Sequence, residues 1–317
     1  MLLVVLAVLS LLIGRVWLPP RELFGGSDAQ QSQLARLIVG ELRLPRTLLA
    51  IGVGAALGLS GAVLQGLTRN PLAEPGLLGI SSGAALGAVV AIYTGLSLRV
   101  ALATPLLGLG FAFGTALLTL ALGRGGGLLV LILAGSAVSG LMLAGTALAL
   151  NVAPNPYAAY EMSQWLLGSL ADKSWEHVWL ALPFVLAGCA LLASTGRSLD
   201  ALALGELQAA SLGVDLARLR LRVVAGTALA VGAATSVTGA IGFIGLVAPH
   251  LVRPAVRYEP RRVLWPATLC GAVLLLAADL STRLLPLDQE LKLGVVTGLV
   301  GAPFFIALVL RLKRTAP

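Results

Sequence analysis

The chain has 317 residues, of which 58% are apolar and only 11% charged, and its mean hydropathy is +0.95. This composition excludes an ordinary soluble domain and indicates a polytopic membrane protein. The net charge of +8 would suggest nucleic-acid binding in a soluble protein. Here the basic residues lie at the ends of apolar runs, where they report membrane topology instead.

Crossing ~30 Å of hydrocarbon takes about 20 helical residues, and nine or ten runs of the sequence satisfy this length. The first run lacks the basic segment that precedes a signal peptide core, so we predict an uncleaved span there. The eighth run carries three glycines and a proline and is too short for a full crossing. The runs lie near residues 1–18, 47–67, 78–96, 101–122, 128–150, 176–194, 218–238, 240–253, 263–282 and 294–311.

Three polar segments interrupt the runs. The stretch NPLAEPGLLG, at residues 70–79, contains two prolines and two glycines and cannot continue a helix, so it predicts a turn at a membrane boundary. Residues 151–174 are predicted to form an external loop, and residues 195–217 an internal one. With the N-terminus inside, Lys and Arg show a modest excess on the cytoplasmic side, which is the expected direction.

Several predicted spans carry glycines at four-residue spacing. In lipid, such small residues let two helix backbones approach closely, so we interpret these glycines as helix-packing positions. The pairs are Gly54 and Gly58, Gly83 and Gly87, Gly110 and Gly114, and Gly294 and Gly298.

Signatures of catalysis and of metal binding are scarce. The sequence contains no GxxxxGK[ST], HExxH or GxSxG motif and only two histidines, so we predict no catalytic residue and no metal site. A carrier coupled to protons would need acids in mid-membrane, but almost all acids lie at run ends. Asp279 is the exception, and the spacing to Arg283 predicts a local ion pair.

The internal segment LDALALGELQAASLGVDLARLR predicts an amphipathic helix that ends at Gly213 and lies along the cytoplasmic face. Such order favours a docking surface for a cytoplasmic partner. At the other side, Arg43 and Arg46 in LRLPR are predicted at the outer mouth of the second span. They offer two permanently charged forks, either for carboxylates of a partner or for lipid headgroups.

These segments together resemble the FecCD-type permease subunits of ATP-binding-cassette (ABC) importers for iron-siderophores, haem and cobalamin. The resemblance covers the chain from about residue 40 to its C-terminus. It is carried by LRLPRTLLA (42–50), SGAVLQGLTRNPLAEPGLLGISSGAALG (60–87), LILAGSAVSG (131–140), WLLGSL (165–170), LALGELQAASLGV (202–214), GAIGFIGLVAPHLVR (239–253) and ELKLGVVTGLVGAPFFI (290–306).

The resemblance implies an all-α fold of about ten transmembrane helices, the type II importer permease fold, as a single domain over residues 1–317. It implies a dimer of permeases in the bacterial cytoplasmic membrane, two ATPase subunits and a periplasmic binding protein, without nucleic acid. ATP and Mg²⁺ would bind the ATPase, and this chain would hold no cofactor of its own. A ferric siderophore is the first expected cargo, with haem or cobalamin as alternatives. A secondary transporter that needs no binding protein is the alternative of a different class.

The resemblance also assigns roles to residues. Docking of the binding protein is expected at Arg43, Arg46 and Arg283. The cytoplasmic junction between the second and third helices is expected to comprise Asn70, Pro71, Glu74, Pro75 and Gly76. Coupling helices at about 198–216 are expected to meet the ATPase through Glu206, Leu207, Ala209, Ala210, Leu212 and Gly213. The pathway should be lined by the fifth helix, residues 131–151, and partly by the tenth; the loop GRGGGLLV before the fifth helix lacks the hydroxyls of some relatives.

Overall fold

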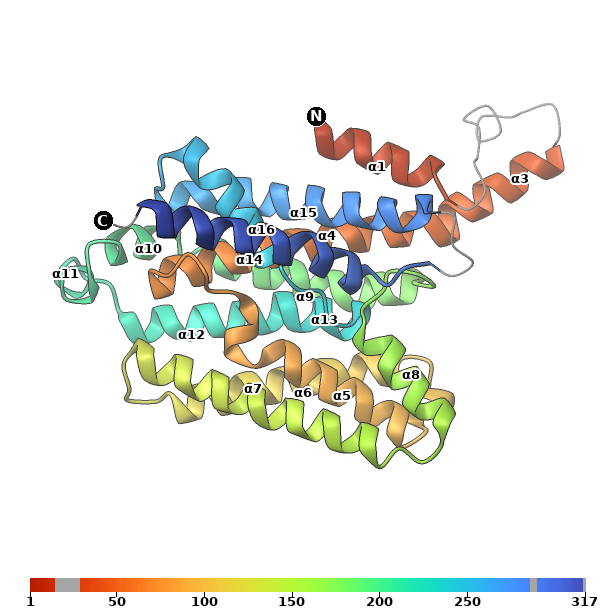
Figure 1. Ribbon diagram of the computed structural model, residues 1–317, viewed down its shortest axis with the longest axis horizontal. Helices are drawn as coiled ribbons and strands as arrows, with labels where there is room; N and C mark the ends of the chain where they lie inside the picture. The colour runs from red at the N-terminus through yellow and green to blue at the C-terminus, as the bar shows by residue number, and fades with distance from the viewer. Residues whose placement is uncertain (15–28, 286–289, 316–317) are drawn as a thin grey trace.

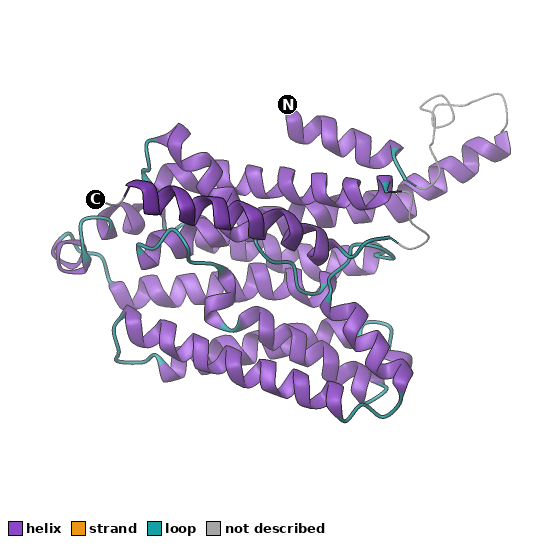
Figure 2. Ribbon diagram, in the orientation of Figure 1, coloured by secondary structure: helices purple, strands orange, loops and turns teal. Residues whose placement is uncertain are grey.

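The computed structural model describes residues 1–14, 29–285 and 290–315, and the described part is helical and contains no strand (Figure 2). Six helices are long and apolar enough to span a membrane, and four shorter apolar helices accompany them. They correspond one by one to the ten predicted runs, which confirms the predicted fold class. Residues 15–18 of the first predicted run lie outside the described residues.

The helices run roughly parallel (Figure 1). The first half of the chain contains α1 (Leu2–Leu12), α3 (Ala29–Leu37), the π-helical turn η1 (Ile38–Arg43), α4 (Leu44–Thr68), the 3-10 turn η2 (Pro75–Leu78), α5 (Ile80–Tyr93), the turn η3 (Leu96–Leu98), α6 (Ala103–Leu122), α7 (Leu128–Asn151) and α8 (Pro156–Leu166).

The second half contains α9 (Trp175–Ala193), α10 (Gly196–Leu202), α11 (Glu206–Ser211), α12 (Leu216–Thr227), the π-helical turn η4 (Ala228–Gly232), α13 (Ala233–Thr238), α14 (Ile244–Val252), the 3-10 turn η5 (Arg253–Val256), α15 (Pro260–Leu284) and α16 (Leu293–Thr315).

Helix α4 lies at the centre of the packing. It contacts α15, α14 and α9, whereas α5, α6, α7 and α8 pack together as a separate layer (Figure 1). The close approach depends on glycine: a methyl group added at Gly54 would lie 2.4 Å from the Gly271 carbonyl oxygen of α15, and one at Gly61 only 1.8 Å from the Gly245 oxygen of α14. Two glycine seams of α4 therefore fix the core.

The glycine prediction holds for three of the four pairs at least in part. Gly54 and Gly58 pack against α15, and Gly83 and Gly87 pack against α6. Gly294 lies against the carbonyl oxygens of Leu167 and Ala240, but a methyl group at Gly298 would meet nothing within 4 Å. For Gly110 and Gly114 the prediction is wrong within this chain, because both are exposed on α6 and nothing lies within 4 Å of either.

Two boundaries differ from the predictions. The second span does not begin at residue 47 but continues a helix from Gln30 to Thr68, because η1 absorbs the missing donor of Pro45 in a wider turn. The external segment 151–174 is not only a loop, since it contains α8. The Asn155 side chain accepts a hydrogen bond of 2.8 Å from the Ala158 N–H, and Pro156 opens the helix, which is a standard helix start.

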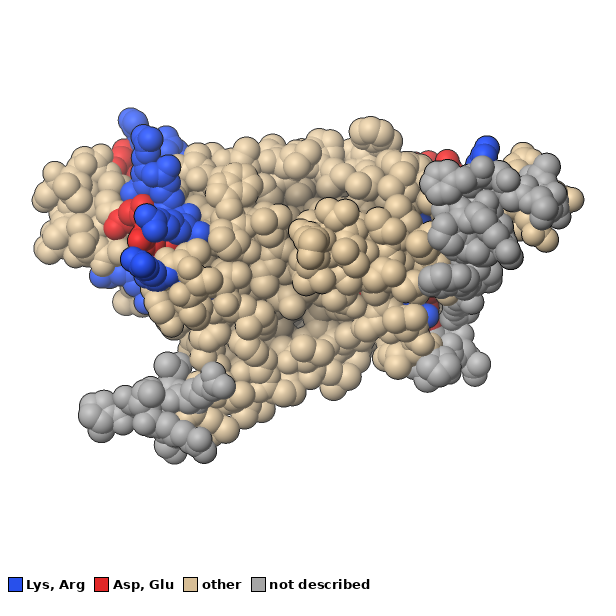
Figure 3. All heavy atoms as spheres, turned by 90° about the horizontal axis from the view of Figure 1, so that it is seen from above, with Lys and Arg blue, Asp and Glu red and all other residues tan. Residues whose placement is uncertain are grey.

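Charged residues gather at the two ends of the helices and leave a broad uncharged belt between them (Figure 3). Most of the Lys and Arg visible in this view lie at the end that carries α10 and α11 (Figures 1 and 3). This distribution matches a protein that spans a membrane with α10 and α11 on the cytoplasmic side.

Candidate functional site

At the outer end of the helices, a buried ionic network joins α4 to α15. Asp279, with a side chain only 1% exposed, accepts hydrogen bonds from the guanidinium groups of both Arg46 and Arg283. The Arg46 Nη2 atom lies 2.8 Å from Asp279 Oδ1 and 2.9 Å from Glu290 Oε2. The predicted ion pair of Asp279 and Arg283 is confirmed, and the structure adds Arg46 and Glu290 to it.

Arg283 of this network and the neighbouring Arg43 bind the end of α1. Arg43 Nη1 donates to the Leu11 carbonyl oxygen at 3.0 Å, and Arg283 Nη1 donates to the Ser10 oxygen at 2.9 Å. Carbonyls at a helix C-terminus lack partners within the helix and carry partial negative charge, so guanidinium groups stabilise them. Arg43 and Arg283 thus fix α1 against α4 and α15.

This geometry corrects the predicted placement of the arginines. The sequence predicts that Arg43 and Arg46 stand at the outer mouth of the second span and offer their forks to a partner's carboxylates or to lipid headgroups. Instead, both lie inside a continuous helix, and Arg43 and Arg283 are buried. The cause is tertiary, because α1 and the acid on α15 draw the guanidinium groups inward. Their role in docking stays a prediction.

The cytoplasmic end of the chain forms an elbow of two short helices, α10 and α11. Gly205 and Gly213, with φ of 118° and 85°, turn the backbone on either side of α11, which agrees with the predicted helix and its glycine end. Leu207 and Leu212 are 82% and 65% exposed, as an apolar contact surface requires. Ala210 is exposed and Glu206 half-buried.

Ala209 does not belong to this exposed surface. Its side chain is fully buried in the core of the chain, so it supports α11 instead of facing a partner. The elbow is also tied to α15, because the Asp200 Oδ1 atom accepts a hydrogen bond of 2.9 Å from the Arg261 N–H. An acid at the first turn of a helix stabilises its free N–H groups. Sequence reasoning missed this contact, because Asp200 lies in α10, 61 residues before Arg261, and no local pattern links the two.

The predicted junction at Asn70 to Gly76 does end α4. Arg69 adopts a left-handed conformation with φ of 50°, and the Asn70 N–H donates to the Gln65 carbonyl oxygen at 3.2 Å. This is the Schellman arrangement, usually completed by glycine. Pro75 then begins η2, and Gly79, with φ of 75°, leads into α5. Burial raises the pKa of the Glu74 carboxyl group above its ordinary value.

The predicted pathway helix α7 is the least covered of the long helices. Leu133, Leu141 and Leu148 are exposed along its length, and only 17% of its apolar window is buried within this chain. An apolar cavity of about 260 Å³ lies between α14, α15 and α16, next to Phe243 and Gly301. The surfaces of α7 and α16 are therefore open to lipid, to a second chain or to a transported molecule.

Comparison with known proteins agrees with this architecture. The FecCD transport family matches residues 2–311. The hemin transport system permease protein HmuU of Yersinia pestis is 39% identical over 318 residues, covering 99% of this chain and 94% of that protein. The vitamin B12 import system permease protein BtuC of Klebsiella pneumoniae is 39% identical, covering 98% and 92%. The Fe(3+) dicitrate transport system permease protein FecC of Escherichia coli is 39% identical, covering 88% and 84%.

Solved structures give the same result. A metal-chelate type ABC transporter, described in an inward-facing conformation, superposes with a TM-score of 0.88 at 36% identity, covering 98% of this chain and 96% of that one. PsaBC from Streptococcus pneumoniae, at 17% identity and a TM-score of 0.56, shares the fold. The expected resemblance is therefore confirmed: this chain belongs to the FecCD transport family and is a multi-pass membrane permease of the ABC importer type.

Proposed function

We propose that this chain is the permease of a binding-protein-dependent importer that carries an iron chelate, first a ferric siderophore, across the bacterial cytoplasmic membrane. Relatives of similar identity are named for hemin, vitamin B12 and ferric dicitrate, which are all metal complexes with bulky organic ligands. The weakly polar surfaces of α7 and α16 suit such a cargo, since they offer few groups that would hold it. Haem and cobalamin remain the alternative cargoes.

The observation that carries the proposal is the elbow of α10 and α11. Leu207 and Leu212 protrude from a short helix at the basic end of the molecule, on a backbone fixed by two glycines. An isolated chain gains nothing from exposing two leucines to water, whereas a partner with an apolar cleft would bury them. Because the sequence has no P-loop motif, we assign ATP and Mg²⁺ to two ATPase subunits that grip this elbow.

The outer end is proposed to receive the binding protein. Of the three arginines, Arg46 has a side chain that is 13% exposed, and its partner Glu290 is 24% exposed. A carboxylate of the binding protein could replace Glu290 on the Arg46 fork without disturbing Asp279. The exposed face of α7 is proposed to meet a second permease copy, so that the pathway forms between the two chains.

Reconstitution tests this proposal directly. The chain, co-expressed with a candidate ABC ATPase subunit, is placed in proteoliposomes with a loaded binding protein, and ATP hydrolysis and uptake of radioactive iron are measured. We expect the loaded binding protein to stimulate hydrolysis and uptake to require ATP. Uptake by the chain alone, without any ATPase, would overturn the proposal in favour of a secondary transporter.

A further inference from the structure

A cavity of about 400 Å³ opens at the cytoplasmic end of α4, away from the network and the elbow described above. It lies between the end of α4, α14, η5, the start of α15 and Leu308 of α16. Its lining includes Arg69 and Arg253, which are the residues at which α4 and α14 end. The cavity therefore lies at the depth of the lipid headgroups and not in the hydrocarbon core.

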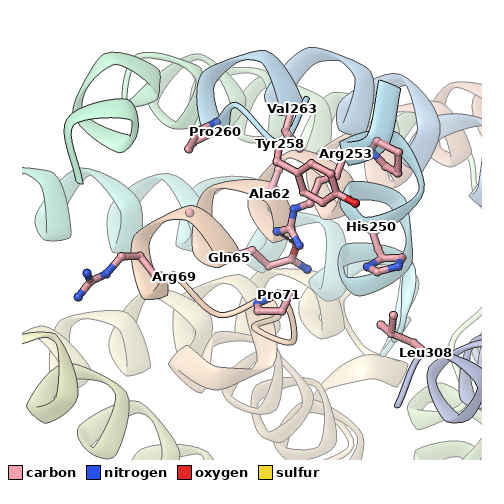
Figure 4. A pocket seen from close by; sticks show the side chains of 12 residues that line it. Ala62, Gln65, Arg69, Pro71, His250, Arg253, Tyr258, Pro260, Val263 and Leu308 are labelled. Atoms are coloured by element: carbon pink, nitrogen blue, oxygen red, sulfur yellow. Dashed lines mark hydrogen bonds between the residues drawn. The ribbon is translucent and has the colours of Figure 1, made fainter. Parts of the chain in front are cut away.

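Hydrogen-bond donors from separate segments converge on this cavity. Figure 4 shows Arg253 and Tyr258 beside His250 of α14, with the Arg253 guanidinium directed at Gln65 of α4. Gln65 is buried and accepts a hydrogen bond from Arg253, while its own amide donates to the Leu246 carbonyl oxygen at 3.4 Å. Arg253 lines the cavity and is held by this bond, and a guanidinium group has five N–H donors, more than the bond to Gln65 uses.

The cavity carries positive charge that no acid neutralises. Its lining contains Arg69 and Arg253 but no Asp or Glu. In the part of the chain that the structure describes, neither arginine lies within ion-pair distance of a carboxylate, unlike Arg46, Arg218, Arg262 and Arg283. Two uncompensated guanidinium groups beside a cavity favour an anion from outside the chain.

Two residues that line the cavity have a strained backbone. Arg69 and Tyr258 both have positive φ, 50° and 62°, in a region that residues other than Gly, Asn and Asp rarely adopt. Each such residue is strained relative to one in the ordinary helical or extended region. Glycine would relieve this strain at either position.

The remaining lining is apolar and distinguishes between anions. Ala62, Val263 and Leu308 line the cavity together with Pro71, Pro254 and Pro260. A fully hydrated free anion gains nothing from such surface, whereas the glycerol and first acyl carbons of a phospholipid do. Anionic lipids are also concentrated in the cytoplasmic leaflet, where they attract basic segments.

We propose that this cavity binds the phosphate headgroup of an anionic phospholipid. Arg253 is the principal phosphate ligand, positioned by Gln65, while His250 and the Tyr258 hydroxyl group complete the donor set. Figure 4 shows the Arg69 side chain pointing away from these groups, so it contributes its charge from the mouth of the cavity.

The test measures lipid retention by native mass spectrometry on the purified full-length chain in detergent, titrated with dioleoylphosphatidylglycerol or dioleoylphosphatidylcholine. We expect the anionic lipid to bind more tightly. Arg253→Gln should weaken binding of the anionic lipid about tenfold, because a hydrogen-bonded charge pair is lost. Arg253→Lys keeps the charge but loses the planar fork. Its affinity for the anionic lipid should lie between those of the wild type and of Arg253→Gln.

A matched pair of variants separates binding from folding. Arg69→Gly and Arg257→Gly each remove an exposed arginine with positive φ, 50° and 56°, but Arg257 does not line the cavity. Both variants should raise the thermal denaturation temperature by relieving the backbone. Only Arg69→Gly should weaken lipid binding, by about threefold, as expected for an exposed charge.

Three outcomes would overturn the inference. Equal binding of the two lipids would remove the requirement for an anion. If Arg253→Gln bound the anionic lipid as tightly as wild type, and Arg69→Gly and Arg257→Gly had equal affinities for it, the lipid would bind elsewhere on the protein. Displacement of bound lipid by millimolar inorganic phosphate, together with no preference between the two lipids, would reassign the cavity to free phosphate.

Discussion

The buried network at the outer end can be tested by Asp279→Asn. This substitution keeps the shape of the side chain but removes one of two negative charges, so that Arg43, Arg46 and Arg283 would be balanced by Glu290 alone. Removing one member of a buried ion pair costs roughly 3–5 kcal/mol. Because the amide oxygen still accepts a hydrogen bond, we expect the lower end, about 3 kcal/mol, and a fall of roughly 6 °C in the thermal denaturation temperature.

In the assay, the purified chain in detergent is heated to a series of temperatures. The folded protein that remains after each temperature is measured by size-exclusion chromatography. The matched control is Glu259→Gln at the N-cap of the same helix α15. It breaks an exposed pair with Arg262 and should shift stability by less than about 0.5 kcal/mol. The double variant Asp279→Leu with Arg283→Met removes both charges and should recover about half of the loss. If Asp279→Asn denatured like Glu259→Gln, the network would not stabilise the fold.

Two further variants, Arg46→Ala and Arg43→Ala, distinguish stabilisation from docking. Arg46→Ala should weaken binding of the loaded binding protein in proteoliposomes if Arg46 receives its carboxylate. Arg43→Ala should lower the denaturation temperature without a specific effect on binding, because its guanidinium faces the Leu11 carbonyl. Equal loss of binding in both variants at equal stability would contradict the inward role assigned to Arg43.

Three further outcomes follow from particular contacts. Leu207→Asp should lower ATPase stimulation in proteoliposomes about tenfold. The denaturation temperature should not change, since the Leu207 side chain is exposed in the isolated chain. Full stimulation in this variant would remove Leu207 from the ATPase surface. Gly61→Ala should cost about 1–3 kcal/mol because its methyl group meets the Gly245 oxygen, whereas Gly114→Ala should be harmless in the same denaturation assay. Burial raises the pKa of Glu74, so its ionisation destabilises the folded state at pH values above the unfolded pKa of about 4.3. Glu74→Gln should therefore be more stable than wild type at neutral pH. This difference in stability should shrink as the pH is lowered, because the Glu74 carboxyl group then becomes protonated in the wild type.

The number and order of the membrane helices could be predicted because apolar length alone determines them. The turn at Asn70 and the glycine ends of α11 could also be predicted, since they depend on local backbone chemistry. The start of the second span could not be predicted. A proline such as Pro45 normally marks the start of a helix, and here the π-helical turn η1 lets the helix continue through it. The Asn155–Pro156 pair was a readable start signal for α8, and it was missed in a segment treated as a loop.

The direction of the arginines lay beyond sequence reasoning for a different reason. Spacing placed Arg43 and Arg46 near one another, but whether they face water or protein depends on where α1 and α15 lie. The same limit applies to Gly110 and Gly114, which have the spacing of a packing seam and yet face away from the chain. Sequence spacing indicates which residues share a face, whereas tertiary contacts decide what that face meets.

Helix α15 connects the two ends that these proposals concern. Its 25 residues span about 37 Å, from the Arg261 N–H bonded to Asp200 of the elbow to Arg283 bonded to the carbonyls of α1. The glycine seam at Gly54 fixes its middle against α4. A displacement of the elbow is therefore resisted at three points along one helix. It follows that Asp279→Asn loosens only the outer point, so it should lower stability while leaving ATPase stimulation through Leu207 intact; loss of both together would mean that α15 transmits motion as one rigid element.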